Sequence, residues 1–272
     1  MGSWSKVHLP AMTAALHRSL RVLELLVAHP EGRSLSSLAQ QTEMPLSATH
    51  RVLTDLCQAG YVRQVSEQGI YVLTIKLVAM GLTFLSGSGV VDIAQPLLER
   101  LAKHSGELVR MAVRDADDLV FVAKAQGATR GLRYDPDMGL SVALSCSAAG
   151  HALLSTMTDD EALAVVARQG LGRPADHGPR APTTMRALLP YIRAARKRGF
   201  SLIVEVFAPG MSAMSAPIRR RDGQVIGVVT IAGPMVRLTE PRMVELGPEL
   251  IATAAEIGGA SQASAFFKQR AA

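Results

Sequence analysis

The sequence has few of the features that mark secreted, metal-binding or membrane proteins. Among its 272 residues are two cysteines, Cys57 and Cys146, and no CxxC or Cys/His spacing accompanies them. Neither a disulfide framework nor a zinc site is therefore indicated. The first ten residues lack the apolar run of a signal peptide, and no stretch reaches the ~18 uninterrupted apolar residues of a membrane helix. We expect reduced thiols, no cofactor or metal, no membrane contact and a cytoplasmic location.

What the composition does contain is enough apolar material for folded cores. Hydrophobic residues make up 48% of the chain and charged residues 19%, which excludes a disordered chain. A length of 272 residues suits two domains. The net charge of +6 favours a polyanionic partner or an acidic ligand, although many enzymes are equally basic.

The N-terminal part contains three segments with helical signals. The first carries apolar residues at helical spacing before a proline, and these are Leu16, Leu20, Leu23 and Leu26 or Val27. Ser34 is a good N-cap for a short second helix. Pro45 suits the first turn of a third helix, because its missing N–H would be unpaired there. Gly60 suits a left-handed exit from that helix.

Two alternating runs, "YVRQV" and "IYVLTI", follow Gly60 around the sequence "SEQG", and this is the pattern of a short hairpin. Three helices and a hairpin are the plan of a winged helix-turn-helix, which we assign to residues 12–75. Residues 76–106 contain two further helical segments that meet at Gly87 and Gly89. They are the expected linker.

The remaining residues, 107–262, are expected to form a second domain of a different kind. Strand-like runs occupy residues 108–114, 119–125, 131–135, 200–207, 214–220 and 225–233, and helices are expected at about 148–157, 159–169, 185–198 and 239–259. "DADD" and "RRDGQ" supply turns. Strand pairs around a helical middle indicate an antiparallel sheet with helices on one face, an α+β sensor-like domain.

The third helix, residues 46–58, has two chemically distinct faces. The face expected to pack on the preceding helices carries Leu46, Thr49, Leu53 and Leu56, with Val52 beside it. The other carries Ser47, His50, Arg51, Thr54 and Gln58. That second face suits hydrogen bonds to phosphates and to base edges in a major groove. An ordinary solvated face is the alternative, and seven Lys/Arg against five acids over residues 1–80 add little.

The order of these segments resembles the IclR family of transcriptional regulators. The matching motifs are "RSLRVLELL" in the first helix, "LA" in the second, "THRVL" in the third and "GYV" before the hairpin. The likeness continues through "GELVRMAVRDADDLVFVAKAQG" and "PGMSAMSAPIRRRDGQVIGVVTIAG", and it covers about residues 13–260. Each motif alone is weak, whereas their order and spacing over two domains are specific.

The resemblance implies a winged helix that binds double-stranded DNA and a GAF-like domain that binds an effector and mediates oligomerisation. In a helix-turn-helix, the early residues of the second helix meet the bases. The residues expected to contact DNA are Ser36, Ser47, Ala48, Thr49, His50, Arg51 and Thr54. A homodimer or homotetramer would bind a pseudo-palindromic operator as a repressor or an activator, with the linker helices setting the separation of the winged helices.

The stretch "LSCSAAGHALL", residues 144–154, begins a predicted helix with a run of small residues. Free backbone N–H groups there can hold a carboxylate, or the small residues can simply permit close packing. The resemblance implies that the amides of Ala148 and Ala149 hold a carboxylic acid effector. The full set of expected effector-binding residues is Met111, Leu132, Leu140, Ser145, Cys146, Ser147, Ala148, Ala149, Ile203, Glu205 and Ala213.

Two of these positions depart from the family pattern. Glu205 retains an acid of the cluster before "PG", but Ile203 stands at a nearby position that is often acidic. Ala213 stands where many members have cysteine. Because both residues are less polar than their counterparts, we expect an effector larger or more apolar than a two- or three-carbon keto acid, for example an aromatic acid.

Two other classes of function compete with this interpretation. An enzyme on a sensor-like domain would need paired cysteines or a cysteine with a positioned base. The two cysteines are far apart in the sequence, and His151, five residues after Cys146 on a helix, points about 140° away. No catalytic residue is therefore expected. A protein-interaction module whose winged helix does not bind DNA is the second alternative.

Overall fold

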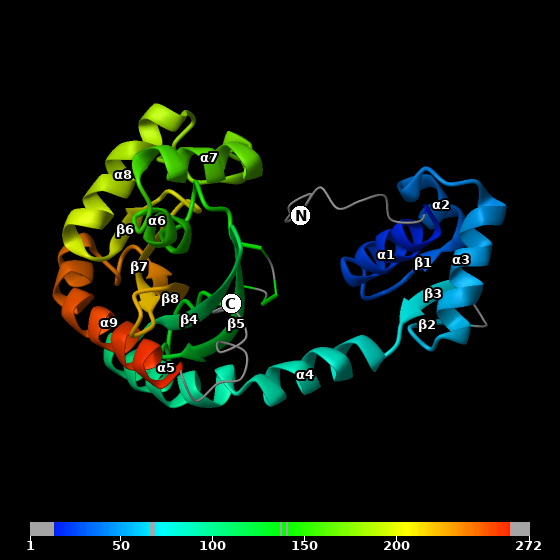
Figure 1. Cartoon of the computed structure of the whole chain (residues 1–272), viewed down its shortest axis with the longest axis horizontal. Coiled ribbons are helices and arrows are strands. Elements are labelled where there is room, and N and C mark those ends of the chain that lie inside the picture. The colour runs from blue at the N-terminus through cyan, green and yellow to red at the C-terminus, as the bar shows by residue number, and fades with distance from the viewer. Residues whose placement is uncertain (1–13, 66–68, 137, 140, 262–272) are drawn as a thin grey trace. The chain divides into compact units, whose positions relative to one another are not determined.

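The computed structural model of the chain describes residues 14–65, 69–136, 138–139 and 141–261. The chain divides into two compact units, whose described residues lie within Val7–Leu85 and Ser86–Ala272. We call these the N-terminal unit and the C-terminal unit. Figure 1 labels the helices and strands of each.

The N-terminal unit combines three helices with a small sheet. Its elements in chain order are α1 (Ala14–Val27), β1 (Arg33–Ser34), α2 (Leu35–Thr42), α3 (Leu46–Gln58), β2 (Val62–Val65) and β3 (Ile70–Leu73), and α4 (Lys76–Ser88) follows them. The strands are antiparallel in the order β1-β3-β2. Three helices followed by a hairpin confirm the predicted winged helix-turn-helix.

Local signals determine where α2 and α3 begin and end. The Ser34 hydroxyl accepts a hydrogen bond from the Ser37 backbone N–H at 3.3 Å, as the predicted N-cap of α2. Gly60 has a φ of +76° and follows the C-cap Ala59, so the left-handed exit from α3 is confirmed. Pro45 lies one residue earlier than predicted, at the N-cap. Its missing N–H costs nothing there, because an N-cap N–H lies outside the helical ladder.

The core of the N-terminal unit meets α1 on a face that shares Leu26, and in part Leu23, with the predicted one and otherwise differs from it. Its buried members are Val22, Leu25, Leu26, Leu38, Val52, Leu53, Leu56, Val62 and Tyr71. Leu16, Leu20 and Val27 are exposed instead, and Leu23 is half-buried. The sequence places apolar residues on two faces of α1, and periodicity alone does not decide which face meets α2 and α3.

The C-terminal unit contains a five-stranded sheet. Its elements are α5 (Val90–Ser105), β4 (Leu108–Asp115), β5 (Asp118–Gln126), α6 (Ala148–Leu154), α7 (Asp159–Gln169), η1 (Pro174–Asp176), α8 (Met185–Arg198), β6 (Ser201–Val204), β7 (Met211–Arg219), β8 (Val225–Pro234) and α9 (Glu240–Ala260). The strand order is β5-β4-β8-β7-β6, with every pair antiparallel. The α+β class with an antiparallel sheet is therefore confirmed.

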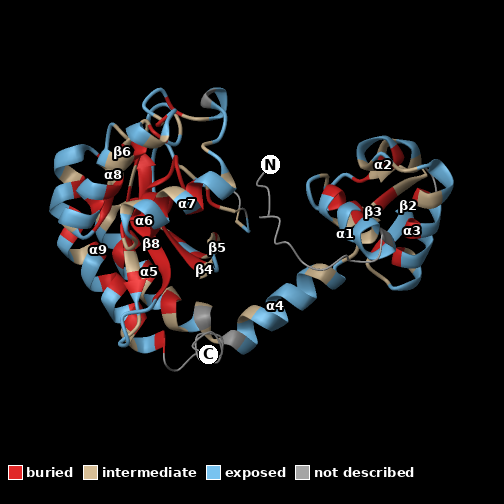
Figure 2. Cartoon of the chain, turned by 45° about the horizontal axis from the view of Figure 1, so that its top comes forward, coloured by how far each residue is buried: buried red, intermediate tan, exposed pale blue. Residues whose placement is uncertain are grey.

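Helices cover both faces of this sheet, although the sequence predicted one covered face. Helices α5 and α9 pack on one face around Leu98, Met111 and Leu250. Helices α6, α7 and α8 lie on the other, around Leu153 and Leu188. Each residue of β8 is buried, as the red strands of Figure 2 show. Its unbroken apolar run, without alternation, is the signal of a strand covered on both sides.

One predicted strand, residues 131–135, is part of a loop between β5 and α6 instead. Carbonyl groups in this segment accept hydrogen bonds from side chains and not from a neighbouring strand. Gln126 Nε2 donates to the Tyr134 carbonyl at 3.1 Å, and Arg237 Nη2 donates to the Leu132 carbonyl at 2.9 Å. Hydrogen bonds from distant side chains to these carbonyl groups leave no periodic pattern in the sequence. The prediction of a strand at residues 131–135 was therefore wrong.

Across the described ranges, no single helix has both the length and the apolar content needed to cross a membrane. The consecutive helices α4 and α5 reach those limits only when they are combined as a bent pair. In α5, Leu98 and Leu101 belong to the core of the C-terminal unit. The apolar residues of that helix are thus accounted for by packing inside a folded domain.

Candidate DNA-binding and effector sites

The outward face of α3 carries most of the polar residues predicted to contact DNA. Ser47, His50, Arg51 and Thr54 are exposed, and Ala48 is half-buried. The opposite face of the helix is buried in the core of the unit. Neither His50 nor Arg51 is held in an ion pair within the described part of the chain. Their hydrogen-bond donors are therefore available to a partner.

Two residues of α3 differ from their predicted roles. Thr49 was predicted both to lie on the packing face and to contact DNA; it is fully buried, which confirms the packing face, and its hydroxyl donates to the Pro45 carbonyl at 3.1 Å. It packs between the helices and has no surface to offer to DNA. Leu46, predicted to pack, is the first residue of α3 and is 55% exposed, so the buried face begins at Thr49. Ser36 on α2 is exposed and shares a hydrogen bond of 3.1 Å with the Ser34 hydroxyl.

A cavity of about 130 Å³ lies inside the C-terminal unit, between the sheet and the start of α6. Its walls are largely apolar or small and comprise Phe121, Tyr134, Pro136, Val142, Ala143, Ala148, Ala149, Ile203, Phe207, Met211, Ala213 and Ala232. Its other lining residues are Arg110, Ser141, Ser147, Ser212 and Thr230. An apolar concavity with a few polar groups is typical of a small-molecule site.

The start of α6, which borders this cavity, is packed tightly. A Cβ on Gly150 would clash with the Leu144 backbone, so no larger residue fits there. The Ser147 hydroxyl accepts from the Gly150 N–H at 3.0 Å and donates to the Ala143 carbonyl at 2.7 Å, which caps the helix. The run of small residues therefore serves close packing, and its first members also line the cavity.

Arg110 on β4 is the one charged side chain among the described residues that line the cavity. Arg110 is 8% exposed, and its guanidinium carbon lies 3.8 Å from the centre of the Phe121 ring and 5.8 Å from that of Tyr134. Its Nε has no hydrogen-bond partner in the described structure. Burial lowers the pKa of Arg110, and the neighbouring Tyr134 and Asp135 partly offset that shift. The cavity thus contains a buried cation.

Sequence reasoning did not select Arg110 or the aromatic walls Phe121, Tyr134 and Phe207. The sequence "LVRMAVRD" contains one signal that points to Arg110, because this arginine interrupts a strand of apolar residues. A charge in such a strand is buried if both faces of the sheet are covered, and a buried charge requires a partner. The aromatic residues come from three separate segments, and no local pattern links them.

Five of the residues predicted to bind an effector do line the cavity: Ser147, Ala148, Ala149, Ile203 and Ala213. They come from the start of α6 and from the paired strands β6 and β7, where Ile203 is the register partner of Ala213. The structure brings these segments together although they lie more than fifty residues apart in the sequence.

The other predicted effector residues that the structure describes do not line the cavity. Met111 lies in the core on the opposite face of the sheet from Arg110, because neighbouring strand residues alternate between faces. Leu132 is 69% exposed, and Leu140 lies outside the described residues. Glu205 occupies a turn with φ of +53°, where its carboxylate accepts a hydrogen bond from the backbone N–H of residue 210 at 3.1 Å.

Ser145 and Cys146 are buried next to the cavity but do not line it, and Cys146 has no base. Burial raises the pKa of the Cys146 thiol, which lies 3.4 Å from the Leu171 carbonyl oxygen. His151 is fully buried, with Nε2 2.7 Å from the Ser145 carbonyl oxygen, and burial lowers its pKa to about 4. A protonated thiol and a neutral imidazole with separate partners have no nucleophilic role. No group of three His, Cys, Asp or Glu side chains in the described ranges is placed to hold a metal ion.

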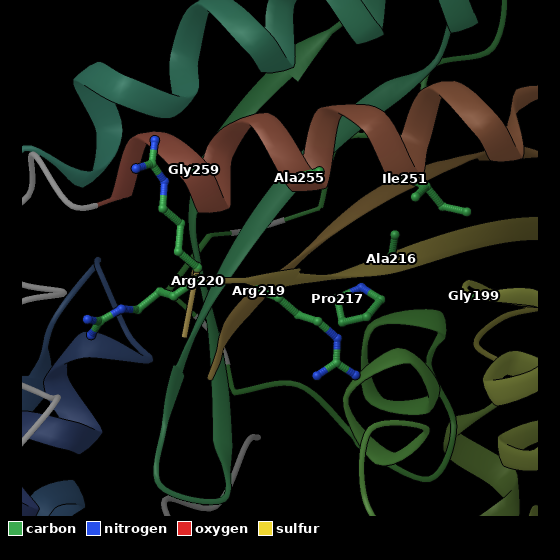
Figure 3. Close-up of a pocket in the computed structure, with 9 residues that line it drawn as sticks. Gly199, Ala216, Pro217, Arg219, Arg220, Ile251, Ala255 and Gly259 are labelled. Atoms are coloured by element: carbon green, nitrogen blue, oxygen red, sulfur yellow. The ribbon is translucent and has the colours of Figure 1, made fainter. Parts of the chain in front are cut away.

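A second hollow lies beside α9 and β7 of the same unit, as Figure 3 shows. Its volume of about 290 Å³ is larger, but it is open to solvent. Arg219 Nη1 donates to the Gly223 carbonyl at 3.3 Å, and Arg220 Nη2 lies 3.1 Å from Asp222 Oδ2. Residues of the turn between β7 and β8 therefore bind two of the arginines that line this hollow. Because its described lining contains no aromatic side chain, this hollow is a poorer candidate for an effector site than the cavity beside α6.

Both halves of the chain match domain profiles of one family. Residues 15–66 match the IclR helix-turn-helix domain, and residues 82–258 match the bacterial transcriptional regulator IclR C-terminal domain. The first covers α3 and the start of the wing, and the second covers the sheet and the cavity.

Full-length relatives agree with these matches. The transcriptional repressor IclR of Escherichia coli (strain K12) is 31% identical over 245 residues, which is 89% of this chain and 88% of that protein. The HTH-type transcriptional repressor AllR of the same organism is 28% identical over 246 residues, 90% of this chain and 89% of that protein. A crystal structure of an IclR homolog complexed with 4-hydroxybenzoate from Microbacterium hydrocarbonoxydans has a TM-score of 0.75 at 22% identity, covering 92% of this chain and 100% of that chain. The chain therefore belongs to the IclR family, and it is a DNA-binding transcriptional repressor rather than an enzyme.

Proposed function

We propose that an organic acid, with aromatic acids favoured, binds in the cavity of the C-terminal unit and changes the affinity of this repressor for its operator. The proposal rests on a partly open cavity walled by Phe121, Tyr134 and Phe207. Buried apolar cavities on the order of 150 Å³ bind benzene, and this cavity, at about 130 Å³, has a similar size. Aromatic walls favour a planar ring, because ring pairs attract one another in offset or edge-to-face geometry.

The small side chains of the cavity leave room for such a ring. Ile203 and Ala213 are less polar than their family counterparts, which favours an apolar effector over a short keto acid. The amides of Ala148 and Ala149 are the carboxylate contact implied by the resemblance to the family, and both residues border the cavity. The IclR homolog crystallised with 4-hydroxybenzoate is a precedent for an aromatic acid bound to this fold.

On the DNA side, we propose that α3 enters the major groove with Ser47, His50 and Arg51 facing base edges and phosphates. Ala48 and Thr54 lie on the same side of the helix. The exposed hydroxyl of Ser36 on α2 completes the proposed contacts, and the buried Thr49 is not among them. The exposure of His50 and Arg51 supports this orientation.

We further propose that the repressor is a homodimer or homotetramer that binds a pseudo-palindromic operator. Exposed apolar residues support self-association, with Leu16 on α1 50% exposed and Val78 and Leu82 on α4 52% and 61% exposed. Exposed apolar surface of this kind is commonly covered by a partner. An effector that favours one separation of the two winged helices would then shift the affinity for DNA.

The test is a fluorescence-anisotropy titration with a duplex that the protein selects from a random library. Benzoate, 4-hydroxybenzoate and phenylacetate are compared with glyoxylate and pyruvate. At least one aromatic acid should change operator affinity by roughly fivefold or more, within the usual range of allosteric coupling. The same acid should raise the melting temperature, because it binds the native state.

An Ala213→Met variant is the matched control, since it fills the cavity without touching α3. It should bind the operator normally and lose the response to the acid. Tight binding of glyoxylate or pyruvate without any binding of aromatic acids would reverse the aromatic preference. An unchanged operator affinity with all five acids would contradict the proposal.

A further inference from the structure

The described lining of the cavity in the C-terminal unit includes one cation, Arg110, and no carboxylate. Asp135, the described acid that acts on Arg110 electrostatically, is exposed and forms an ion pair with Lys124 at 2.6 Å. Arg110 is 8% exposed, and its Nε has no hydrogen-bond partner among the described residues. A charged group in a protein interior is costly unless it is paired and its N–H groups are satisfied. A ligand anion beside Arg110 would supply both the missing charge and the missing acceptor.

The aromatic rings of Phe121 and Tyr134 position the guanidinium group. The Arg110 guanidinium carbon lies 3.8 Å from the centre of the Phe121 ring and 5.8 Å from that of Tyr134. A planar guanidinium that stacks on a ring keeps its edge N–H groups free to donate. Tyr134 is itself held, because its carbonyl accepts a hydrogen bond from Gln126. The donor fork is therefore oriented before a ligand arrives, and such a fork matches the two oxygens of a carboxylate.

From this arrangement we infer that Arg110 recognises the acid group of the effector, and that the cavity selects aromatic acids with a single negative charge. The inference rests on the proposed function, because it assigns the acid-binding residue within the same cavity. One cation is neutralised by one carboxylate. An amide would leave the Arg110 charge without a counter-ion, and a second carboxylate would find no second cation among the described lining residues.

Isothermal titration calorimetry on the full chain tests this selection with benzoate, 4-hydroxybenzoate, benzamide and terephthalate. The wild-type protein should bind the two monocarboxylates at least about tenfold more tightly than benzamide or terephthalate. Arg110→Met should weaken the monocarboxylates by roughly ten- to a hundredfold, the usual effect of losing a charge-assisted hydrogen bond. The affinity of the Arg110→Met variant for benzamide should stay within about threefold of the wild-type value. The variant should therefore no longer prefer the monocarboxylates over benzamide. Arg110→Lys retains the charge without the fork, so it should keep a reduced preference.

Thermal unfolding without ligand separates recognition from a purely structural role. Methionine has a similar volume, and replacing an unpaired buried charge by an apolar group is neutral or stabilising. The ligand-free melting temperature of Arg110→Met should therefore not fall. A lower melting temperature together with an intact preference for benzoate over benzamide would make Arg110 a packing residue and overturn the inference.

Asp137 lies outside the described residues, so an Asp137→Asn variant tests whether that acid already neutralises Arg110. Unchanged affinity and preference in this variant support the inference, and a change in either overturns it. If aromatic acids bind but the Arg110→Met variant keeps the preference, the inference fails and the proposed function stands. If no aromatic acid binds to the wild-type protein, both fail.

Discussion

The two units differ in where they carry their polar residues of interest: the N-terminal unit exposes them, and the C-terminal unit buries them. In the N-terminal unit, α3 buries Leu53 and exposes His50 and Arg51. In the C-terminal unit, Arg110 and His151 lie inside, among apolar side chains. The difference suits the proposed partners, because duplex DNA must be met at a surface whereas a small acid can be enclosed.

The exposed and the buried arginine also differ in how much free energy of hydration they lose when the protein folds. An exposed cation such as Arg51 remains hydrated until DNA arrives, so the folded state loses little by carrying it. A buried cation such as Arg110 loses its hydration when the domain folds. The inward-facing site is therefore expected to reduce the stability of its own domain, while the outward-facing site is not.

The largest effect is expected from the core behind the DNA-contact face. Leu53→Ala removes a fully buried side chain and should lower the local free energy of unfolding by about 2–5 kcal/mol. Leu46→Ala, on the same helix but 55% exposed, should stay within about 0.5 kcal/mol. Hydrogen exchange with mass spectrometry, applied to the full chain, measures each unit separately. Faster exchange in β4–β8 of Leu53→Ala would show that the two cores are not independent.

A comparable effect is expected from the buried imidazole of the other unit. The pKa of His151 is lowered by burial from 6.5 to about 4 in the folded protein. Between these values the unfolded chain binds more protons, so stability is complete above pH 6.5 and falls as the pH drops towards 4. The total loss is about 3 kcal/mol. Urea unfolding followed by circular dichroism from pH 7.5 to 4 measures it. His151→Asn should flatten the profile, and an equal slope in both proteins would assign the acid sensitivity to other groups.

The smallest effect is expected at the exposed face itself. Arg51→Ala should weaken operator binding by roughly five- to 150-fold, because it removes one base or phosphate contact. Fluorescence anisotropy at several salt concentrations distinguishes these two cases. Loss of a phosphate contact lowers the salt slope, whereas loss of a base contact changes the preferred sequence. Arg168→Ala in the C-terminal unit, an exposed arginine paired with Asp117, is the control. Unchanged affinity in Arg51→Ala would contradict the proposed face.

Helices with strong end signals could be predicted closely from the sequence. The predicted ranges 159–169 and 185–198 coincide with α7 and α8, where Thr158 and Thr184 cap the first turns. The predicted strand at 131–135 was wrong, because long-range side chains satisfy that segment. The buried face of α1 was predicted correctly only at Leu26 and in part at Leu23, because the apolar residues of this helix occupy two faces and only contact with α2 and α3 selects one.

The order of elements, the two-domain plan and the polar stripe of α3 follow from local sequence signals, because caps, glycines and helical periodicity act over a few residues. The meeting of Arg110, Phe121 and Tyr134 around one cavity, with Met111 on the opposite face of the sheet, depends instead on the packed fold. These residues belong to different strands and a loop, so their approach depends on how β4 pairs with its neighbours. Whether a side chain is buried is likewise a property of the whole packed sheet and its two helical layers, and no short stretch of sequence contains it.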